Sequence, residues 1–201
     1  MITRKFERRN SVSNVAALAL AITSLVCGES CAQPVGENLV AAVPSGFKVG
    51  YQTGHDQMSM QEWVRESESV ANWTEMVTVQ VFHANKTQTP YQFLQSIGKQ
   101  WLQTCTGAVP NNIINGQANG YPVSMLLLRC PLNPATKKPE TTAVRVIRGG
   151  DALYSVQKAF RFDPSNEQLA QAMLYLSNVN VCDTRQTDHP CPNFNATGAQ
   201  K

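Results

Sequence analysis

Alternation of apolar and polar positions predicts most of the strands in this chain. In "EMVTVQVFH", residues 75–83, three valines lie two residues apart and therefore share one face of a strand: Val77, Val79 and Val81. Other segments rich in β-branched and aromatic residues are also predicted as strands: 38–52 (broken near its middle), 58–64, 112–118, 121–130, 141–147 and 152–162. The turn residues Asn119-Gly120 and Gly149-Gly150-Asp151 predict hairpins between consecutive strands.

A helix is predicted after residue 89, because its start carries three capping signals. Thr89 suits the N-cap, Pro90 the first helical position and Gln92 the third position of a capping box. Apolar side chains then recur every four residues, and we expect this stripe to be the buried face: Phe93, Ile97, Trp101 and Cys105.

A second helix is predicted within "DPSNEQLAQAMLYLSNV", residues 163–179. Asp163 or Ser165 is the expected cap, and Pro164 suits a first turn. The apolar stripe of this helix is formed by three residues: Leu169, Met173 and Leu176.

The order of elements predicts an α+β fold, an antiparallel sheet with two principal helices packed on it. We expect a flexible lead over 33–37 and a single domain over 38–178. A disulfide-closed loop and a disordered tail are expected over 179–201, since the last ten residues are polar and terminal.

This element order, from Asn38 to Asn178, resembles the PsbP-like superfamily, an α/β sandwich family. The superfamily includes photosystem accessory proteins, Ran-binding Mog proteins and bacterial periplasmic proteins of the DcrB and LpqN kind. The resemblance implies an accessory or binding role without chemistry. The chain departs from the lipoprotein members because it lacks their lipobox.

The N-terminus has the layout of a secretory signal peptide over residues 1–32. Basic residues come first, an apolar run extends from Val15 to Val26, and small residues follow. That run is shorter than the roughly 20 residues of a membrane span, so we expect cleavage rather than a transmembrane anchor. Ser30 and Ala32 place the cut before Gln33.

Three alternatives for this segment remain. Val26 and Gly28 allow an earlier cut. Cys27 and Cys31 could carry lipid, although neither follows the Leu-small-small order of a lipoprotein signal. The Arg8-Arg9 pair suggests twin-arginine export, but the residues after it are not apolar, so general secretion is favoured.

Charge argues against nucleic acid as a partner. Of 17 Lys and Arg residues, four lie in 1–32, and of 14 Asp and Glu residues, two lie there. The mature chain of 169 residues therefore carries 13 basic and 12 acidic side chains, a net charge near +1. Binding to nucleic acid or to anionic lipid needs basic residues clustered on one face, and the mature sequence shows no such cluster.

Four cysteines remain after cleavage, and an even number in an exported chain predicts disulfides. Cys105 lies on the buried stripe of the first helix, and Cys130 shares a strand face with Leu126 and Leu128. We expect these two cysteines to pair, which leaves Cys182 and Cys191 to close the tail loop. Zinc sites favour shorter spacings than that of this last pair, which has eight residues between its two cysteines.

Few residues suggest chemistry. His55 with Asp56, and Glu66 with Glu68, could serve an exported hydrolase, whereas His189 with its neighbouring aspartates Asp183 and Asp188 could bind a metal. No nucleophile elbow, phosphate loop, zinc-protease or dinucleotide motif occurs.

We therefore predict no catalytic residue, no metal ligand and no cofactor, and the sequence favours a protein that is not an enzyme. The predicted function is that of an exported binding or accessory protein of the bacterial envelope, periplasmic or secreted. Its partner is an unknown protein or small molecule. A hydrolase and a metal-binding protein are the alternatives.

Overall fold

The computed structural model describes residues 35–85 and 87–192. In chain order its elements are β1 (Glu37–Val40), β2 (Phe47–His55), β3 (Met58–Arg65), β4 (Glu75–Phe82), α1 (Pro90–Thr104), β5 (Val109–Pro110), β6 (Ile114–Ala118), β7 (Tyr121–Asn133), β8 (Lys138–Arg148), β9 (Leu153–Phe160), α2 (Asn166–Ser177) and β10 (Asn180–Asp183). The predicted signal peptide and the predicted tail beyond residue 192 lie outside the described residues.

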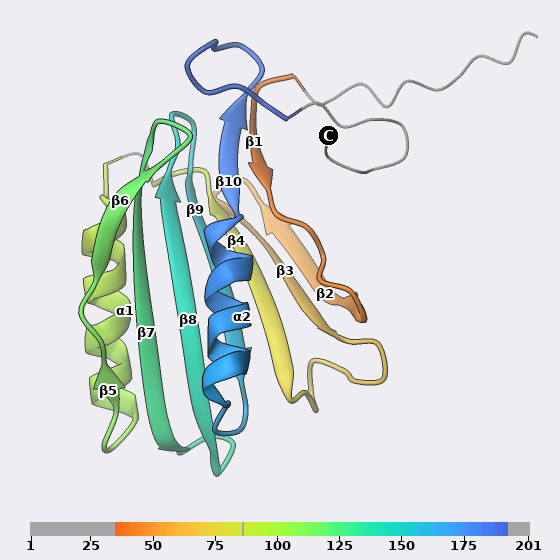
Figure 1. Cartoon of the computed structure of the whole chain (residues 1–201), viewed down its shortest axis with the longest axis vertical. Helices are drawn as coiled ribbons and strands as arrows, with labels where there is room; N and C mark the ends of the chain where they lie inside the picture. Colours follow the sequence, from red (N-terminus) through yellow and green to blue (C-terminus); the bar gives the residue numbers. More distant parts are fainter. Residues whose placement is uncertain (1–34, 86, 193–201) are drawn as a thin grey trace, which may run out of the picture. The chain divides into compact units, whose positions relative to one another are not determined.

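One antiparallel sheet of eight strands organises the described residues (Figure 1). Its order is β2-β3-β4-β9-β8-β7-β5, and β6 pairs with another stretch of β7. The predicted turn between β6 and β7 is present, and Asn119 and Gly120 both have positive φ, as a tight two-residue hairpin requires. β1 and β10 pair with each other as a separate two-stranded ribbon beside α2 (Figure 1).

The two helices cover opposite faces of the sheet. On β7, Leu126 and Leu128 pack with Leu94 of α1. Their neighbours Val123 and Leu127 point the other way and contact the clusters that include residues of α2. The predicted α+β fold, with two helices packed on an antiparallel sheet, is therefore confirmed.

Helix α1 begins as predicted but buries a different line of residues. Thr89 is the N-cap, and a capping box with Gln92 is present. The buried positions within the helix are Pro90, Leu94 and Gly98, whereas of the predicted stripe only Cys105, at the C-cap, is buried. The predicted residues flank this line, half-buried: Phe93, Ile97 and Trp101.

Helix α2 is capped by Ser165, whose side chain accepts a hydrogen bond from the Gln168 N–H. Pro164 precedes the cap and so lies outside the first turn. Leu169 and Leu176 are buried as predicted, and Met173 is half-buried and packs against the core cluster. No helix in the part of the chain that the structure describes is long and apolar enough to cross a membrane.

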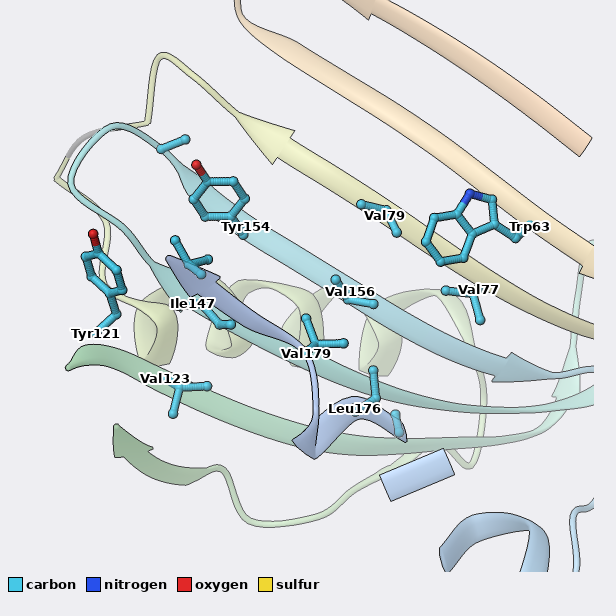
Figure 2. Packing of buried hydrophobic residues seen from close by; sticks show 13 residues of the cluster. Trp63, Val77, Val79, Tyr121, Val123, Ile147, Tyr154, Val156, Leu176 and Val179 are labelled. Atoms are coloured by element: carbon cyan, nitrogen blue, oxygen red, sulfur yellow. The ribbon is translucent and has the colours of Figure 1, made fainter. Parts of the chain in front are cut away.

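The largest core cluster lies on the α2 face of the sheet (Figure 2). Trp63, Val77 and Val79 fill its β3–β4 side, and Leu176 closes it from α2. Trp73 is buried in a separate cluster. Both tryptophans are therefore core residues.

Candidate ligand-binding site

The residues considered for hydrolysis lie at opposite ends of one hairpin. His55 and Asp56 are exposed where β2 turns into β3, whereas Glu66 and Glu68 follow the far end of β3. Seven residue steps along β3 separate the two ends by about 23 Å. Glu68 also accepts hydrogen bonds from the backbone N–H (2.9 Å) and hydroxyl (2.6 Å) of Thr74. The structure therefore keeps His55 and Asp56 apart from Glu66 and Glu68.

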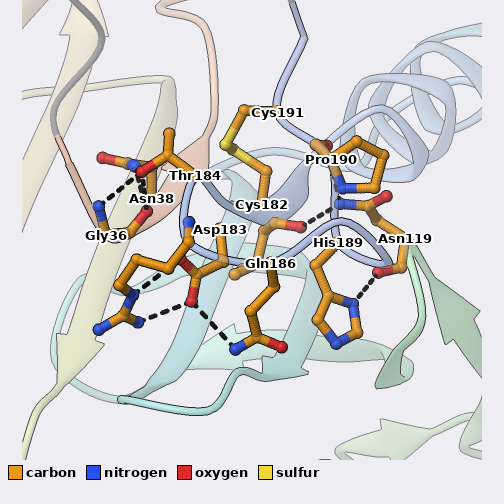
Figure 3. The surroundings of a disulfide bond; sticks show 12 residues. Gly36, Asn38, Asn119, Cys182, Asp183, Thr184, Gln186, His189, Pro190 and Cys191 are labelled. Atoms are coloured by element: carbon orange, nitrogen blue, oxygen red, sulfur yellow. Dashed lines mark hydrogen bonds and ion pairs between the residues drawn. A yellow bond between two sulfur atoms is a disulfide. The ribbon is translucent and has the colours of Figure 1, made fainter.

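His189 holds the tail loop against the β6–β7 turn (Figure 3). Its Nδ1 lies 2.8 Å from the Asn119 carbonyl oxygen, and its ring stacks on Tyr121 with centroids 3.9 Å apart. Its Nε2 is 3.7 Å from a carboxylate oxygen of Asp188, whose side chain is mostly exposed. Across residues 35–85 and 87–192, no three His, Cys, Asp or Glu side chains are grouped so that they could hold a metal.

The disulfides join Cys105 to Cys130 and Cys182 to Cys191, the same pairs that the sequence predicts. The second bond closes the tail loop beside β10 (Figure 3). Asn119 supports this loop from the turn, because its amide donates to the carbonyl oxygens of Val181 (2.9 Å) and Pro190 (3.2 Å). These four cysteines thus have a structural role at two separate places.

Glu37 joins β1 to the β8–β9 turn, a contact that sequence reasoning missed. Its carboxylate accepts backbone hydrogen bonds from Asp151 (3.0 Å) and Ala152 (3.3 Å), together with one from the Tyr154 hydroxyl (2.8 Å). The Gly150 N–H donates to the same carboxylate. The residue assigned to the flexible lead therefore begins β1 and fixes the ribbon to the sheet.

Asp183, at the end of β10, is held by Arg185. The guanidinium donates to both carboxylate oxygens of Asp183 and bridges to Asp151 at 2.6 Å. Hydrogen bonds from Arg185 lower the pKa of the Asp183 carboxyl to about 2. This aspartate, considered above as a metal ligand, is therefore part of an ion-pair network.

We expect an Asp183→Asn variant to unfold at lower urea concentration than the wild type at pH 7. The pKa of this carboxyl falls from an ordinary 3.8 to about 2 on folding, so the unfolded chain takes up the proton first. Its stabilising contribution is present above about pH 4 and is lost as the pH falls toward 2. The difference between wild type and variant should therefore shrink over that range, measured as urea midpoints at pH steps from 2 to 7.

The control for this prediction is Asp188→Asn, in the same loop, where the side chain is mostly exposed. That variant should stay close to the wild type throughout. An Asp183→Asn difference that is the same at pH 2 and pH 7 would contradict the assignment.

An apolar groove lies on the α2 face, between α2 and the β5–β6 edge of the sheet. It encloses a cavity of about 520 Å³. The lining residues come from three parts of the chain: Pro110, Asn111, Asn112, Ile114, Met125, Leu126, Leu127 and Met173. One of these apolar side chains is strongly exposed, with 65% for Ile114. The groove thus combines an apolar wall with two amide side chains.

A smaller cavity of about 310 Å³ lies between β1 and strands β2 to β4. Trp63 lines it, and the indole N–H already donates to Gln61 at 3.0 Å. Its wall mixes amides, hydroxyls and small apolar groups, without a charged side chain. The larger groove is the stronger candidate because it has the more exposed apolar rim.

Arg145 of β8 lies next to the larger groove. It is only 7% exposed, and its cross-strand neighbours on the α2 face are Met125 and Val156. Its Nη1 lies 3.6 Å from the sulfur of Met125, which lines the cavity. Burial lowers the pKa of this guanidinium. Among the described residues, no carboxylate forms an ion pair with it, and its Nε has no hydrogen-bond partner.

Comparison with known proteins found no matching family model and no matching curated sequence. Several solved structures are similar. LpqN of Mycobacterium tuberculosis, described as involved in cell envelope biogenesis, is 13% identical over 75% of this chain and 87% of its own, with a TM-score of 0.48. The Ran-binding protein Mog1p of Saccharomyces cerevisiae is 15% identical over 71% and 85%, with a TM-score of 0.41.

PsbP from the cyanobacterium Synechocystis is 11% identical over 74% of this chain and 92% of its own, with a TM-score of 0.38. The likeness concerns the fold alone, and no residue of the groove is assigned a role from it.

Proposed function

We propose that this chain is an exported, non-enzymatic binding or accessory protein that takes a small, largely apolar molecule into the groove between α2 and the β5–β6 edge. The observation that carries the proposal is the cavity of about 520 Å³ lined by the exposed side chain of Ile114. Small-molecule sites in proteins enclose about 300–1,000 Å³ and have mostly apolar walls with few polar groups. The groove fits that description.

Two features support export. The N-terminal 32 residues have the composition of a signal peptide. The two disulfides suit an oxidising compartment such as the periplasm or the exterior of the cell. An enzyme is less well supported, because the histidines and carboxylates that could catalyse hydrolysis lie apart.

The test uses the full precursor expressed in a bacterial host and recovered from the periplasm. Intact mass should correspond to residues 33–201 without lipid. Titration with the neutral fluorescent probe N-phenyl-1-naphthylamine should then give saturable binding that Ile114→Asn weakens about tenfold, because apolar contact area is lost.

Leu132→Asn is the matched control, since Leu132 is also exposed (56%) and does not line the groove. It should bind the probe like the wild type. A retained N-terminal segment would contradict export. Probe binding that is absent, or equally affected by both substitutions, would contradict the groove as the site.

A further inference from the structure

Arg145 differs from the other buried or half-buried cations in the part of the chain that the structure describes. Lys158 bonds to Glu75 at 2.7 Å, Arg148 donates to the carbonyl oxygens of Asn85 and Gln88, and Arg161 stacks over Trp73 at 3.9 Å. Arg145 has a thioether as its polar neighbour. Its charge is therefore uncompensated within the described chain.

An uncompensated buried guanidinium is costly. Arginine stays protonated in proteins, so it cannot escape the penalty by releasing its proton. Burial of an unpaired charge costs several kcal/mol, whereas a carboxylate can occupy two of its donors at once. The position therefore favours an anion supplied from outside the described residues.

The groove offers a route for such an anion. Met125 separates the guanidinium from the cavity, and methionine side chains are flexible enough to move aside. The amides of Asn111 and Asn112 line the same cavity and can donate to an anionic oxygen. Ile114, Leu127 and Met173 form the apolar remainder of the wall.

We infer that the ligand of the groove is an amphipathic carboxylate, with its carboxylate on Arg145 and its hydrocarbon body along the apolar wall. The inference rests on the proposed function, because it names the ligand class for the same groove. It explains why a groove with an apolar wall has an arginine beneath it rather than an aliphatic residue. The apolar tail of such a ligand accounts for the exposed apolar side chain of Ile114 at the rim.

The experiment compares decanoate with decanol, which share a hydrocarbon tail, as competitors of the neutral probe on the mature protein. We expect decanoate to bind the wild type at least about tenfold more tightly, the value of a charge-assisted hydrogen bond. Arg145→Met should abolish that preference and leave decanol binding unchanged. Removal of an unpaired buried charge is compatible with folding, and thermal unfolding of the variant checks this.

Arg129→Met is the control, because Arg129 is an exposed arginine on the adjacent strand β7. It should keep the preference for decanoate. Arg145→Lys, which retains a cation without the planar fork, should keep part of it. If Arg145→Met does not fold, the inference is tested by the ratio of decanoate to decanol affinity in the wild type and in Arg145→Lys.

The outcomes separate this inference from the proposed function. Equal affinity of decanoate and decanol for the wild type, or a preference that survives in Arg145→Met, would overturn the assignment of the anion while the groove remains an apolar site. Displacement of the probe by neither compound would overturn both.

Discussion

We expect Glu75→Gln to lower the free energy of unfolding by about 3 kcal/mol, the cost of removing one partner of a buried ion pair. Glu75 is 9% exposed and accepts hydrogen bonds from Lys158 at 2.7 Å and from Arg65. Burial alone would raise the pKa of Glu75, but these two cations outweigh it and lower the pKa. The carboxylate is therefore needed in its charged form.

The loss arises because Lys158 keeps its charge in an apolar site. Its ammonium is 4.2 Å from the Phe47 ring and 5.3 Å from the Phe160 ring, and the residue is 7% exposed. Glutamine preserves the shape of the removed carboxylate but supplies no negative charge. The measurement is urea unfolding at pH 7. The dependence of the unfolding free energy on urea concentration should be the same in each variant, so that a shifted midpoint reports a change in stability.

A double variant and a surface control test whether the loss comes from the unpaired buried charge. Glu75→Leu combined with Lys158→Met removes both buried charges and should cost less than Glu75→Gln alone. Glu66→Gln, at an exposed position just after β3, should change stability by less than about 0.5 kcal/mol. If Glu75→Gln were no less stable than Glu66→Gln, the ion pair between Glu75 and Lys158 would be unimportant for stability.

Strand positions were predictable because alternation reports burial directly. Val77 and Val79 lie on one face of β4 as the period of two requires. The choice of helix face was harder. A four-residue repeat through Phe93 identifies the apolar side of α1, but the central line depends on the sheet beneath it. Gly98 lies on that line, and a Cβ at its position would make an ordinary van der Waals contact with Leu126 at 3.8 Å.

The groove was not predictable, because its wall combines residues between 110 and 127 with Met173, which lies far along the chain on another element. Arg145 illustrates the difficulty. In "TTAVRVI" it alternates with Val144 and Val146, which is typical of a strand with one face in water. Helices cover both faces of this sheet, so the same alternation buries the arginine. Ala143 and Ile147, on the same face as Arg145, were the available signal.

Glu37 was missed for a different reason. Its partners are backbone N–H groups of the β8–β9 turn, more than a hundred residues away, and backbone donors leave no trace in a side-chain pattern. The contact suits a glycine at Gly149, because a Cβ there would collide with the Glu37 carboxylate, whereas a Cβ on Gly150 would lie 3.4 Å from it. The sequence indicated only a hairpin turn there.

The second large effect is expected from removal of the Cys105–Cys130 disulfide. A bond that closes a separation of 25 residues restricts the unfolded chain by about 3.5 kcal/mol in the chain-entropy model, against about 2.6 kcal/mol for the nine-residue separation of Cys182 and Cys191. Double alanine variants should therefore lose stability in that order, measured by urea unfolding under non-reducing conditions.

Local packing strengthens this ordering. Both Cys105 and Cys130 are at most 4% exposed and join the end of α1 to β7, whereas in the other pair Cys182 is 1% exposed and Cys191 is half-buried. Replacement of the first pair therefore removes buried contacts at both positions, between a helix and the sheet. The tail loop keeps other contacts with the sheet when its disulfide is removed, because His189 stacks on Tyr121 and the Asn119 amide donates a hydrogen bond to the Val181 carbonyl oxygen. A larger loss for the Cys182→Ala and Cys191→Ala pair would contradict this account. It would mean that the Cys182–Cys191 bond stabilises the β1–β10 ribbon more than the Cys105–Cys130 bond stabilises the packing of α1 on the sheet.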